Sequence, residues 1–396
     1  MRQYSFVSET PHASATSVEN ESDLLLLFLK QCNLLMNELY AWQDELWQRW
    51  IGLHARLPHA VLLKGPQGIG KLDFAMNLAR SLLCKKSLGS KLACQDCTSC
   101  HWFEQGNHPD FRLLLSGAQS IEMQESSDFQ ASLILKSWTK RIAEEVLDEQ
   151  QKKGKKPSKE ISVHQVRSLA NFINLSTHQG GHRVVLIHPA EAMNANAANA
   201  LLKTLEEPPD RMLIILVSHK PQQLLPTIVS RCLTLAAPMP SLEASSTWLQ
   251  QQKYANPVAM LARAGFAPLL AARLAEEAIG EGEYSLFLQE IKQPAKFDVF
   301  ALAEQLQRTE PLHVIHWLQQ WCYDLGSAKL TGKVRYHPYL ADLIKNLSNN
   351  IAMFDLLRYQ NELIIAKREA LHPLNPKLLF ESILLSYRHM MLGVDR

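Results

Sequence analysis

The sequence lacks a membrane-length apolar run and an excess of charge of either sign. Its longest apolar run near the start, Leu24 to Leu29, is much shorter than the roughly 20 residues that a membrane span requires. No signal peptide or anchor is visible. With 41 Lys and Arg against 39 Asp and Glu, the chain is far from the positive bias of a protein that binds nucleic acid over one basic face. We expect a cytoplasmic protein without a membrane partner, whose DNA contacts are local or shared.

The cysteines are too few, and odd in number, for a secreted disulfide scaffold. There are seven, an odd number that fits a reducing compartment. Four of them follow a Cys-x9-Cys-x2-Cys-x2-Cys pattern, at Cys84, Cys94, Cys97 and Cys100. Four thiolates suit tetrahedral Zn²⁺, and a site without a vacancy for water is structural. We predict structural zinc, with unligated cysteines or a disulfide pair as alternatives and His101 and His108 as spare ligands. The others are interpreted as ordinary small residues, Cys32, Cys232 and Cys322.

Short β-like runs alternate with helical patterns in the first 240 or so residues. Such alternation predicts an α/β fold, a parallel sheet covered by helices on both faces. The four runs are Val61–Leu63, Phe111–Leu115, Val184–Ile187 and Leu213–Val217.

Two segments stand apart from this pattern. Residues 1–35 are rich in Ser, Glu and Asn, and we expect an N-terminal extension that is disordered or not native, with Met36 as the true start. Residues 116–160 form a polar, charged insert with a basic end, Lys152 to Lys159. We interpret the insert as a surface excursion with a flexible tip, and favour a solvated loop over a DNA contact.

After Pro238 and Pro240 the strand signals stop, and the rest of the chain is typical of amphipathic helices. The helical periodicity is interrupted again near Gly280 to Glu283, which indicates a second boundary. The predicted parts are a core at 36–237 that includes the cysteine module 84–100, a small helical unit at 238–281 and an all-helical unit at 282–396.

The stretch Gly65-Pro66-Gln67-Gly68-Ile69-Gly70-Lys71 follows a predicted strand and opens a predicted helix, the context of a phosphate-binding loop. Gly65, Gly68 and Gly70 let backbone N–H groups turn toward phosphate, the helix N-terminus adds its positive end, and Lys71 can reach the outer phosphates. The alternative is a glycine-rich strand-to-helix turn with a surface lysine.

The partners that such a loop needs for hydrolysis are missing. A Ser or Thr after the lysine would bind Mg²⁺, but Leu72 has no oxygen. The predicted strand ending at Ile187 runs into His188 and Pro189, where an Asp for the metal and a Glu for the water would stand. Glu191 comes three residues too late. We expect no Mg²⁺ site, and the sequence leaves open whether ATP still binds.

Two further motifs complete the pattern, Leu205-Glu206-Glu207-Pro208-Pro209 and Ser230-Arg231-Cys232. Together with the loop and the four cysteines, they resemble the clamp-loader branch of the AAA+ ATPases, and within it the delta-prime subunits of bacterial DNA polymerase III. The resemblance covers roughly Met36 to Arg396 and is strongest from Ala60 to Cys232. It implies an AAA+ core, a helical lid and a helical collar, in a hetero-pentameric ring with gamma/tau-type and delta-type subunits that loads the sliding clamp onto primed DNA.

The resemblance also implies residue roles. Arg231 matches an arginine finger, which projects into the ATP site of the neighbouring subunit; the bland alternative is a surface pair with a carboxylate. Ser218 matches a phosphate-sensing position, with a structural role expected here, and Pro268 stands where active members carry a second sensing arginine. Trp317 and Trp321 lie at helical spacing in the collar, and we favour a core or interface role over base stacking because no basic residues interleave with them.

We therefore predict a non-hydrolysing clamp-loader subunit that supplies Arg231 in trans. The alternatives are a stand-alone AAA+ ATPase or helicase loader that uses its own nucleotide, and a zinc-dependent DNA-binding module, which the near-neutral charge disfavours.

Overall fold

The computed structural model describes residues 39–53, 56–87, 92–125, 133–153, 157–174, 177–178, 181–276, 281–370, 372 and 374–393. The expected N-terminal extension, Met36 and Cys32 lie outside the described residues, as do 154–156 of the basic tip and 277–280 at the second predicted boundary.

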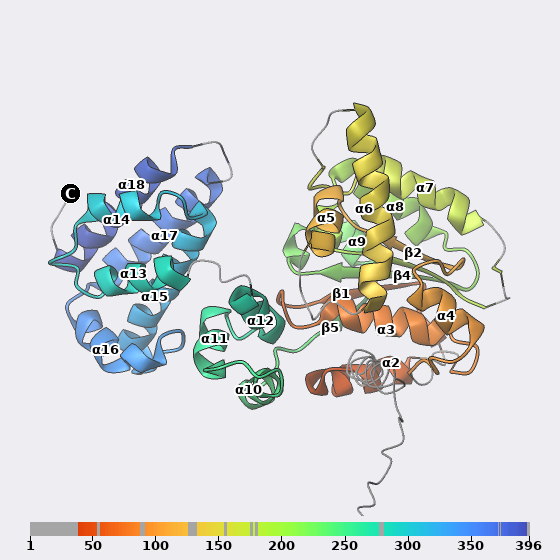
Figure 1. Cartoon of the computed structure of the whole chain (residues 1–396), viewed down its shortest axis with the longest axis horizontal. Helices are drawn as coiled ribbons and strands as arrows, with labels where there is room; N and C mark the ends of the chain where they lie inside the picture. Colours follow the sequence, from red (N-terminus) through yellow and green to blue (C-terminus); the bar gives the residue numbers. More distant parts are fainter. Residues whose placement is uncertain are drawn as a thin grey trace, which may run out of the picture.

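The centre of the first part is a five-stranded parallel sheet with strand order β2-β3-β4-β1-β5 (Figure 1). Its strands are β1 (Ala60–Lys64), β2 (Phe111–Leu114), β3 (Arg183–Ile187), β4 (Met212–Ser218) and β5 (Leu233–Ala236). The central strands read as continuous apolar runs because helices cover both of their faces. The sequence patterns did not predict β5, an edge strand whose side chains are mostly exposed.

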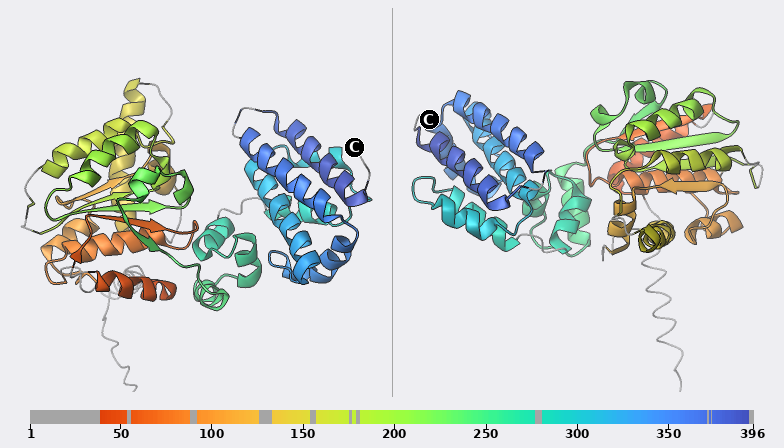
Figure 2. Two further views of the ribbon diagram at one scale, coloured as in Figure 1. Left: turned by 180° about the vertical axis from the view of Figure 1, so that it is seen from behind. Right: turned by 90° about the horizontal axis from the view of Figure 1, so that it is seen from above.

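Side chains alternate between the two faces of the sheet, as strand geometry requires. Along β1, Val61 and Leu63 enter one core while Ala60 and Leu62 enter the other. Figures 1 and 2 show helices on both sides of the sheet. The first core takes in α2 (Asp44–Gly52), α3 (Lys71–Leu83), α4 (Thr98–Glu104) and α6 (Leu133–Lys153); the second takes in α7 (Val163–Asn174), α8 (Ala195–Glu206) and α9 (Pro226–Val229). The predicted fold class is confirmed for this part.

The segment 116–160 differs from the surface excursion that its charge suggested. It forms α5 (Gly117–Glu125) and α6, and the first half of α6 belongs to the core. Trp138 is buried, and its Nε1 donates a hydrogen bond to the Phe103 carbonyl at 2.9 Å. Leu135, Trp138 and Ile142 recur at helical spacing. This periodicity predicts a helix packed on the core, but composition alone does not reveal it because charged residues surround it.

Three short helices follow the sheet, α10 (Leu242–Gln251), α11 (Pro257–Arg263) and α12 (Pro268–Glu276). We call them the lid helices; they share a small core centred on Leu249 and Leu261. Among the described residues no single helix is long and apolar enough to cross a membrane, although α11 and α12, bent by 98°, pass that test as a pair by length and composition.

The remaining helices form a separate bundle, which we call the C-terminal bundle (Figure 2). They are α13 (Glu281–Ile291), α14 (Val299–Leu306), α15 (Pro311–Thr331), α16 (Ala341–Asn349), α17 (Met353–Glu369) and α18 (Pro376–Leu392). Trp317 and Trp321 are buried in its core, and Trp321 Nε1 donates to the Tyr387 hydroxyl at 2.9 Å. The core role predicted for this pair is confirmed.

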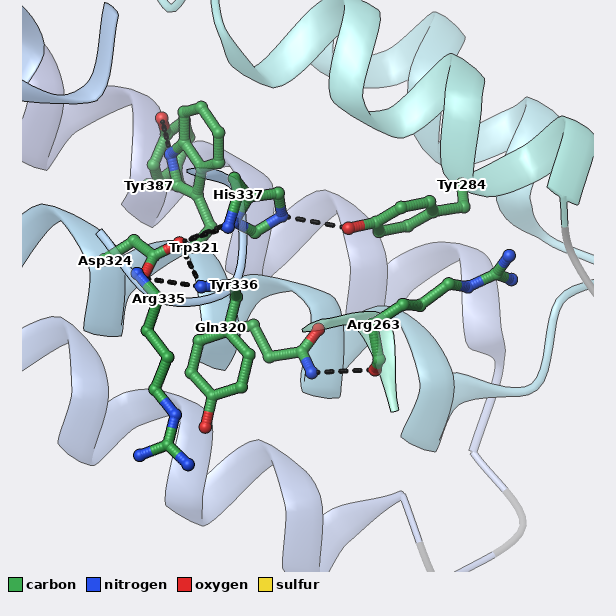
Figure 3. A network of polar contacts seen from close by, with 9 residues as sticks. All are labelled: Arg263, Tyr284, Gln320, Trp321, Asp324, Arg335, Tyr336, His337 and Tyr387. Atoms are coloured by element: carbon green, nitrogen blue, oxygen red, sulfur yellow. Dashed lines mark hydrogen bonds and ion pairs between the residues drawn. The ribbon is translucent and has the colours of Figure 1, made fainter. Parts of the chain in front are cut away.

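A buried carboxylate organises the loop between α15 and α16 (Figure 3). Asp324 accepts hydrogen bonds from the backbone N–H groups of Arg335, Tyr336 and His337 at 2.8 to 3.1 Å, and from Nδ1 of His337 at 2.8 Å. Both side chains of the Asp324–His337 pair are fully buried. The loop conformation therefore depends on one carboxylate.

The same loop, which belongs to the C-terminal bundle, also contacts the lid helices. Its Arg335 guanidinium lies over the Phe266 ring at 4.8 Å. Nearby, Gln320 donates from Nε2 to the Arg263 carbonyl at the end of α11, and the Arg263 guanidinium lies over the Tyr284 ring (Figure 3). Polar and cation–π contacts thus join the lid helices to this bundle.

Replacing Asp324 with Asn should lower the free energy of unfolding by about 3 to 5 kcal/mol, because it removes one partner of a buried pair and leaves amide donors unpaired. Urea denaturation measures the change. Asp355→Asn is the matched control: Asp355 pairs with Arg358 at 3.0 Å on the surface, and its loss should cost less than about 1 kcal/mol. Equal effects of the two substitutions would contradict the organising role of Asp324.

Candidate functional site

The glycine-rich loop lies where the sequence predicts, between the end of β1 and the start of α3 at Lys71. Gly68 and Gly70 have φ angles of +76° and +83°, which L side chains rarely adopt. The loop borders a cavity of about 570 Å³ that is also lined by α5, by residues after β3 and β4, and by α12. A helix N-terminus and a lysine therefore meet at a cavity, the arrangement that binds phosphate groups.

Lys71 is turned back onto its own loop. The side chain is buried, and Nζ donates a hydrogen bond to the Pro66 carbonyl. Burial lowers the pKa of Lys71 to about 8, although the negative charge of Glu191 acts in the opposite direction. The ammonium group of Lys71 therefore has its hydrogen-bond acceptor within its own loop.

The segment before α2 clamps the loop from one side. Trp42 Nε1 donates to the Ile69 carbonyl at 3.0 Å, and Gln43 Nε2 donates to the Gly70 carbonyl at 2.7 Å. The Tyr40 ring approaches so closely that a Cβ on Gly70 would lie 2.6 Å from it. Sequence reasoning missed this clamp, although the aromatic spacing around Tyr40 and Trp42 was its visible signal.

A three-ring aromatic cluster ties that clamp to the lid helices. Tyr40 stacks on Trp42 with ring centroids 4.8 Å apart, and both rings meet Trp248 of α10 edge-on. Burial, aided by the negative charge of Asp73, raises the pKa of Tyr40 well above its usual value, so the phenol stays neutral. Trp248 was not singled out from the sequence.

The lid helices press on the loop from the other side. Leu269 donates its backbone N–H to the Gly68 carbonyl at 3.0 Å, and a Cβ on Gly68 would lie 2.6 Å from that of Leu270. Gly68 is therefore needed for the close approach of α12. Pro268 is the first residue of α12, a position where proline is well tolerated because the N–H it lacks would have no partner within the helix. Arg273, five residues further on, lines the cavity, and its Nη1 lies 3.7 Å from Glu122 of α5. The sequence patterns gave no reason to select it.

The positions for metal and water chemistry hold other groups. Leu72 is buried in the core beside the sheet. His188 is buried with its ring 5.1 Å from that of His219. Burial, helped by the charges of His219 and Lys71, holds the pKa of His188 well below its usual value. The positions expected for metal and water chemistry therefore hold an alkyl side chain, Leu72, and a neutral imidazole, His188.

Glu191 lines the cavity and uses one of its two carboxylate oxygens for structure, while Oε2 is buried without a hydrogen-bond partner among the described residues. Its Oε1 accepts hydrogen bonds from the backbone N–H groups of His219 and Lys220, at 2.9 and 3.0 Å, and so holds the segment after β4. Ser218 at the end of β4 is fully buried, and its hydroxyl has no hydrogen-bond partner among the described residues.

The four predicted ligand cysteines come together beyond the end of α3. Their Sγ atoms all lie within 4.8 Å of one another, with Cys84–Cys97 at 4.0 Å and Cys94–Cys100 at 3.9 Å. Tetrahedral Zn–S bonds of 2.3 Å imply sulfur–sulfur distances of about 3.8 Å, whereas a disulfide needs about 2.05 Å. The cluster could bind a metal ion, and its geometry fits four thiolate ligands.

The two spare histidines are engaged elsewhere. His108 accepts the backbone N–H of Asp110 at Nδ1, 3.1 Å away, and its Nε2 lies 2.8 Å from the Ser99 hydroxyl. His101 is exposed and lies 3.7 Å from Glu104. Burial tends to raise the pKa of Cys84, but hydrogen bonds from the backbone of Cys94, Ser87 and Lys86 outweigh burial and lower that pKa to about 6.

Arg231 lies two residues after the end of α9, with its side chain partly exposed. Its Nη2 contacts Glu206 Oε1 at 2.8 Å, and its Nη1 donates to the Thr227 carbonyl at 3.0 Å. Ser230 donates to the same carbonyl at 3.1 Å, and Cys232 packs against the core. Within one chain, Arg231 therefore forms a surface pair with a carboxylate, which is the alternative to an arginine finger named above.

Two family models match the chain, "DNA polymerase III, delta subunit" over residues 43–240 and "DNA polymerase III, delta subunit, C terminal" over residues 283–389. The DNA polymerase III subunit delta' of Pseudomonas aeruginosa is 32% identical, over 89% of this chain and 98% of its own length. The Yersinia pestis subunit delta' is 28% identical, over 88% and 95% respectively. A solved Thermotoga maritima structure, a DNA polymerase III gamma subunit-related protein, aligns at 16% identity and a TM-score of 0.36, covering 87% of this chain and 99% of its own. The chain belongs to the delta-prime subunit family of the DNA polymerase III clamp loader.

Proposed function

We propose that this delta-prime subunit hydrolyses no ATP itself and supplies Arg231 to the ATP site of a neighbouring subunit. The observation that carries the proposal is the contrast between the chain's own glycine-rich loop and Arg231. The chain's own loop keeps Gly65, Gly70 and Lys71 but has Leu72 and His188 where metal and water are handled. Arg231, in contrast, stands partly exposed at the end of a short helix.

The chemistry requires a guanidinium at such a position. Charge develops on the γ-phosphate oxygens in the transition state of ATP hydrolysis, and a permanently charged, forked cation can bond two of these oxygens at once. The side chain of Arg231 is 36% exposed, so it can reach a partner without unfolding of the core. Its current contacts, one carboxylate and one carbonyl, are exchangeable surface contacts.

The proposed partners are gamma/tau-type and delta-type subunits in a hetero-pentameric ring, and through the ring the sliding clamp and primed DNA. We propose the helical unit 282–396 as the collar that holds the ring, with the core at 36–237 and the lid at 238–281. Large exposed apolar side chains on the C-terminal bundle support contact with other subunits: Phe354, Leu357, Ile365 and Leu378. A cytoplasmic location follows from this role.

We also propose that Cys84, Cys94, Cys97 and Cys100 hold a structural Zn²⁺ ion. Four thiolates within 4.8 Å of one another leave no ligand position for a reacting water. The residues would tie the end of α3 to α4, since Cys84 follows α3 and Cys100 lies in α4.

Replacing Arg231 with Ala should reduce the ATPase and clamp-loading rates of the reconstituted complex by at least about tenfold, because it removes charge stabilisation in a neighbour's transition state. Assembly, measured by size-exclusion chromatography, should be unchanged. Arg49→Ala is the matched control, since Arg49 is also exposed and paired with a glutamate, Glu45. Wild-type rates for the Arg231 variant would refute the trans role.

Metal analysis of the purified chain should give about one zinc ion per molecule. Cys97→Ser should lose most of that metal, because a hydroxyl replaces a thiolate ligand, whereas Cys232→Ser, outside the cluster, should retain it. A zinc content near zero in protein never exposed to chelator would defeat the zinc proposal.

A further inference from the structure

We propose that Glu206 is a positioning residue that occupies the Arg231 guanidinium and competes with the neighbour's phosphate for it. This inference rests on the proposed function of Arg231. It gives the Leu205-Glu206-Glu207-Pro208-Pro209 segment a role at the same subunit interface as Ser230-Arg231-Cys232.

The end of α8 fixes where the carboxylate stands. Leu205 is buried in the core below the sheet, and α8 ends at Glu206. Glu207 already leaves the helical region, with φ −123° and ψ 69°, because the residue before a proline is pushed out of helical geometry. Glu206 is therefore the last residue held by the helix.

The short helix α9 fixes the other partner. It packs against the same core through Ile228, and Arg231 follows its last residue by two positions. The Thr227 carbonyl holds Nη1, while Glu206 holds Nη2. Both outer nitrogens of the fork, the ones that would bond two phosphate oxygens, are thus engaged within the chain.

The pair is suited to exchange. Glu206 and Arg231 are 50% and 36% exposed, and ion pairs with that much solvent around them contribute little net free energy. A phosphate group carries more charge than a carboxylate and accepts from both nitrogens, so it can replace Glu206. Until a neighbour presents that phosphate, Glu206 neutralises Arg231. The carboxylate therefore opposes, to a modest extent, the binding of nucleotide in the neighbouring site.

The test measures the affinity of the reconstituted complex for a non-hydrolysable ATP analogue. Glu206→Gln removes the charge but keeps the shape, and it should tighten binding about two- to fivefold, the range expected for loss of an exposed ion pair. Glu207→Gln makes the same charge change one residue away, at an exposed side chain, and should leave the affinity unchanged. In an Arg231→Ala background, Glu206→Gln should have no effect, because the cation it masks is gone.

Each outcome decides a different question. If Arg231→Ala slows hydrolysis but Glu206→Gln leaves affinity unchanged or weaker, the competition is wrong while the trans arginine stands. A gain in affinity that persists without Arg231 would also overturn the inference, since it would come from general charge. If Arg231→Ala leaves hydrolysis unchanged, the proposed function fails, and the role of Glu206 fails with it.

Discussion

The close packing around Gly68 and Gly70 is the constraint on which the region around the glycine-rich loop depends. Gly70 lies against the ring of Tyr40, and Gly68 lies against Leu270 of α12. Neither position has room for a Cβ, and both have left-handed backbone angles. The same two residues that a phosphate-binding loop needs therefore also let the N-terminal segment and the lid helices close onto it. In this chain the glycines of the loop therefore also serve packing.

The groups around the cavity also make contacts within the chain. Lys71 donates to its own loop, Glu191 holds the backbone after β4, and burial keeps His188 neutral. Lys71 and one oxygen of Glu191 thus make contacts within the chain, at a place where an active site would use such groups for phosphate, metal or water. Arg231, in contrast, makes only surface contacts. This contrast supports the proposal that the chain's own site is inactive and that Arg231 acts on a neighbouring subunit.

Much of this could be predicted from the sequence. The loop, the four thiolates and the buried strands have strong local signals, because glycine angles, ligand spacing and apolar runs are properties of neighbouring residues. The clamp by Trp42 and Gln43, the cavity position of Arg273 and the Glu206–Arg231 pair join segments far apart in the chain. No periodicity records such contacts. Strand β5 escaped because exposed edge strands carry little apolar pattern.

The central claim is that catalysis in cis has been lost, and Mg²⁺-dependent ATP turnover by the isolated chain tests it most directly. The account predicts no turnover above that of a Lys71→Ala variant, because neither chain holds a metal ligand at Leu72 or a base at Pro189. Turnover by the wild-type chain alone that requires Mg²⁺ and disappears in the Lys71→Ala variant would contradict the account.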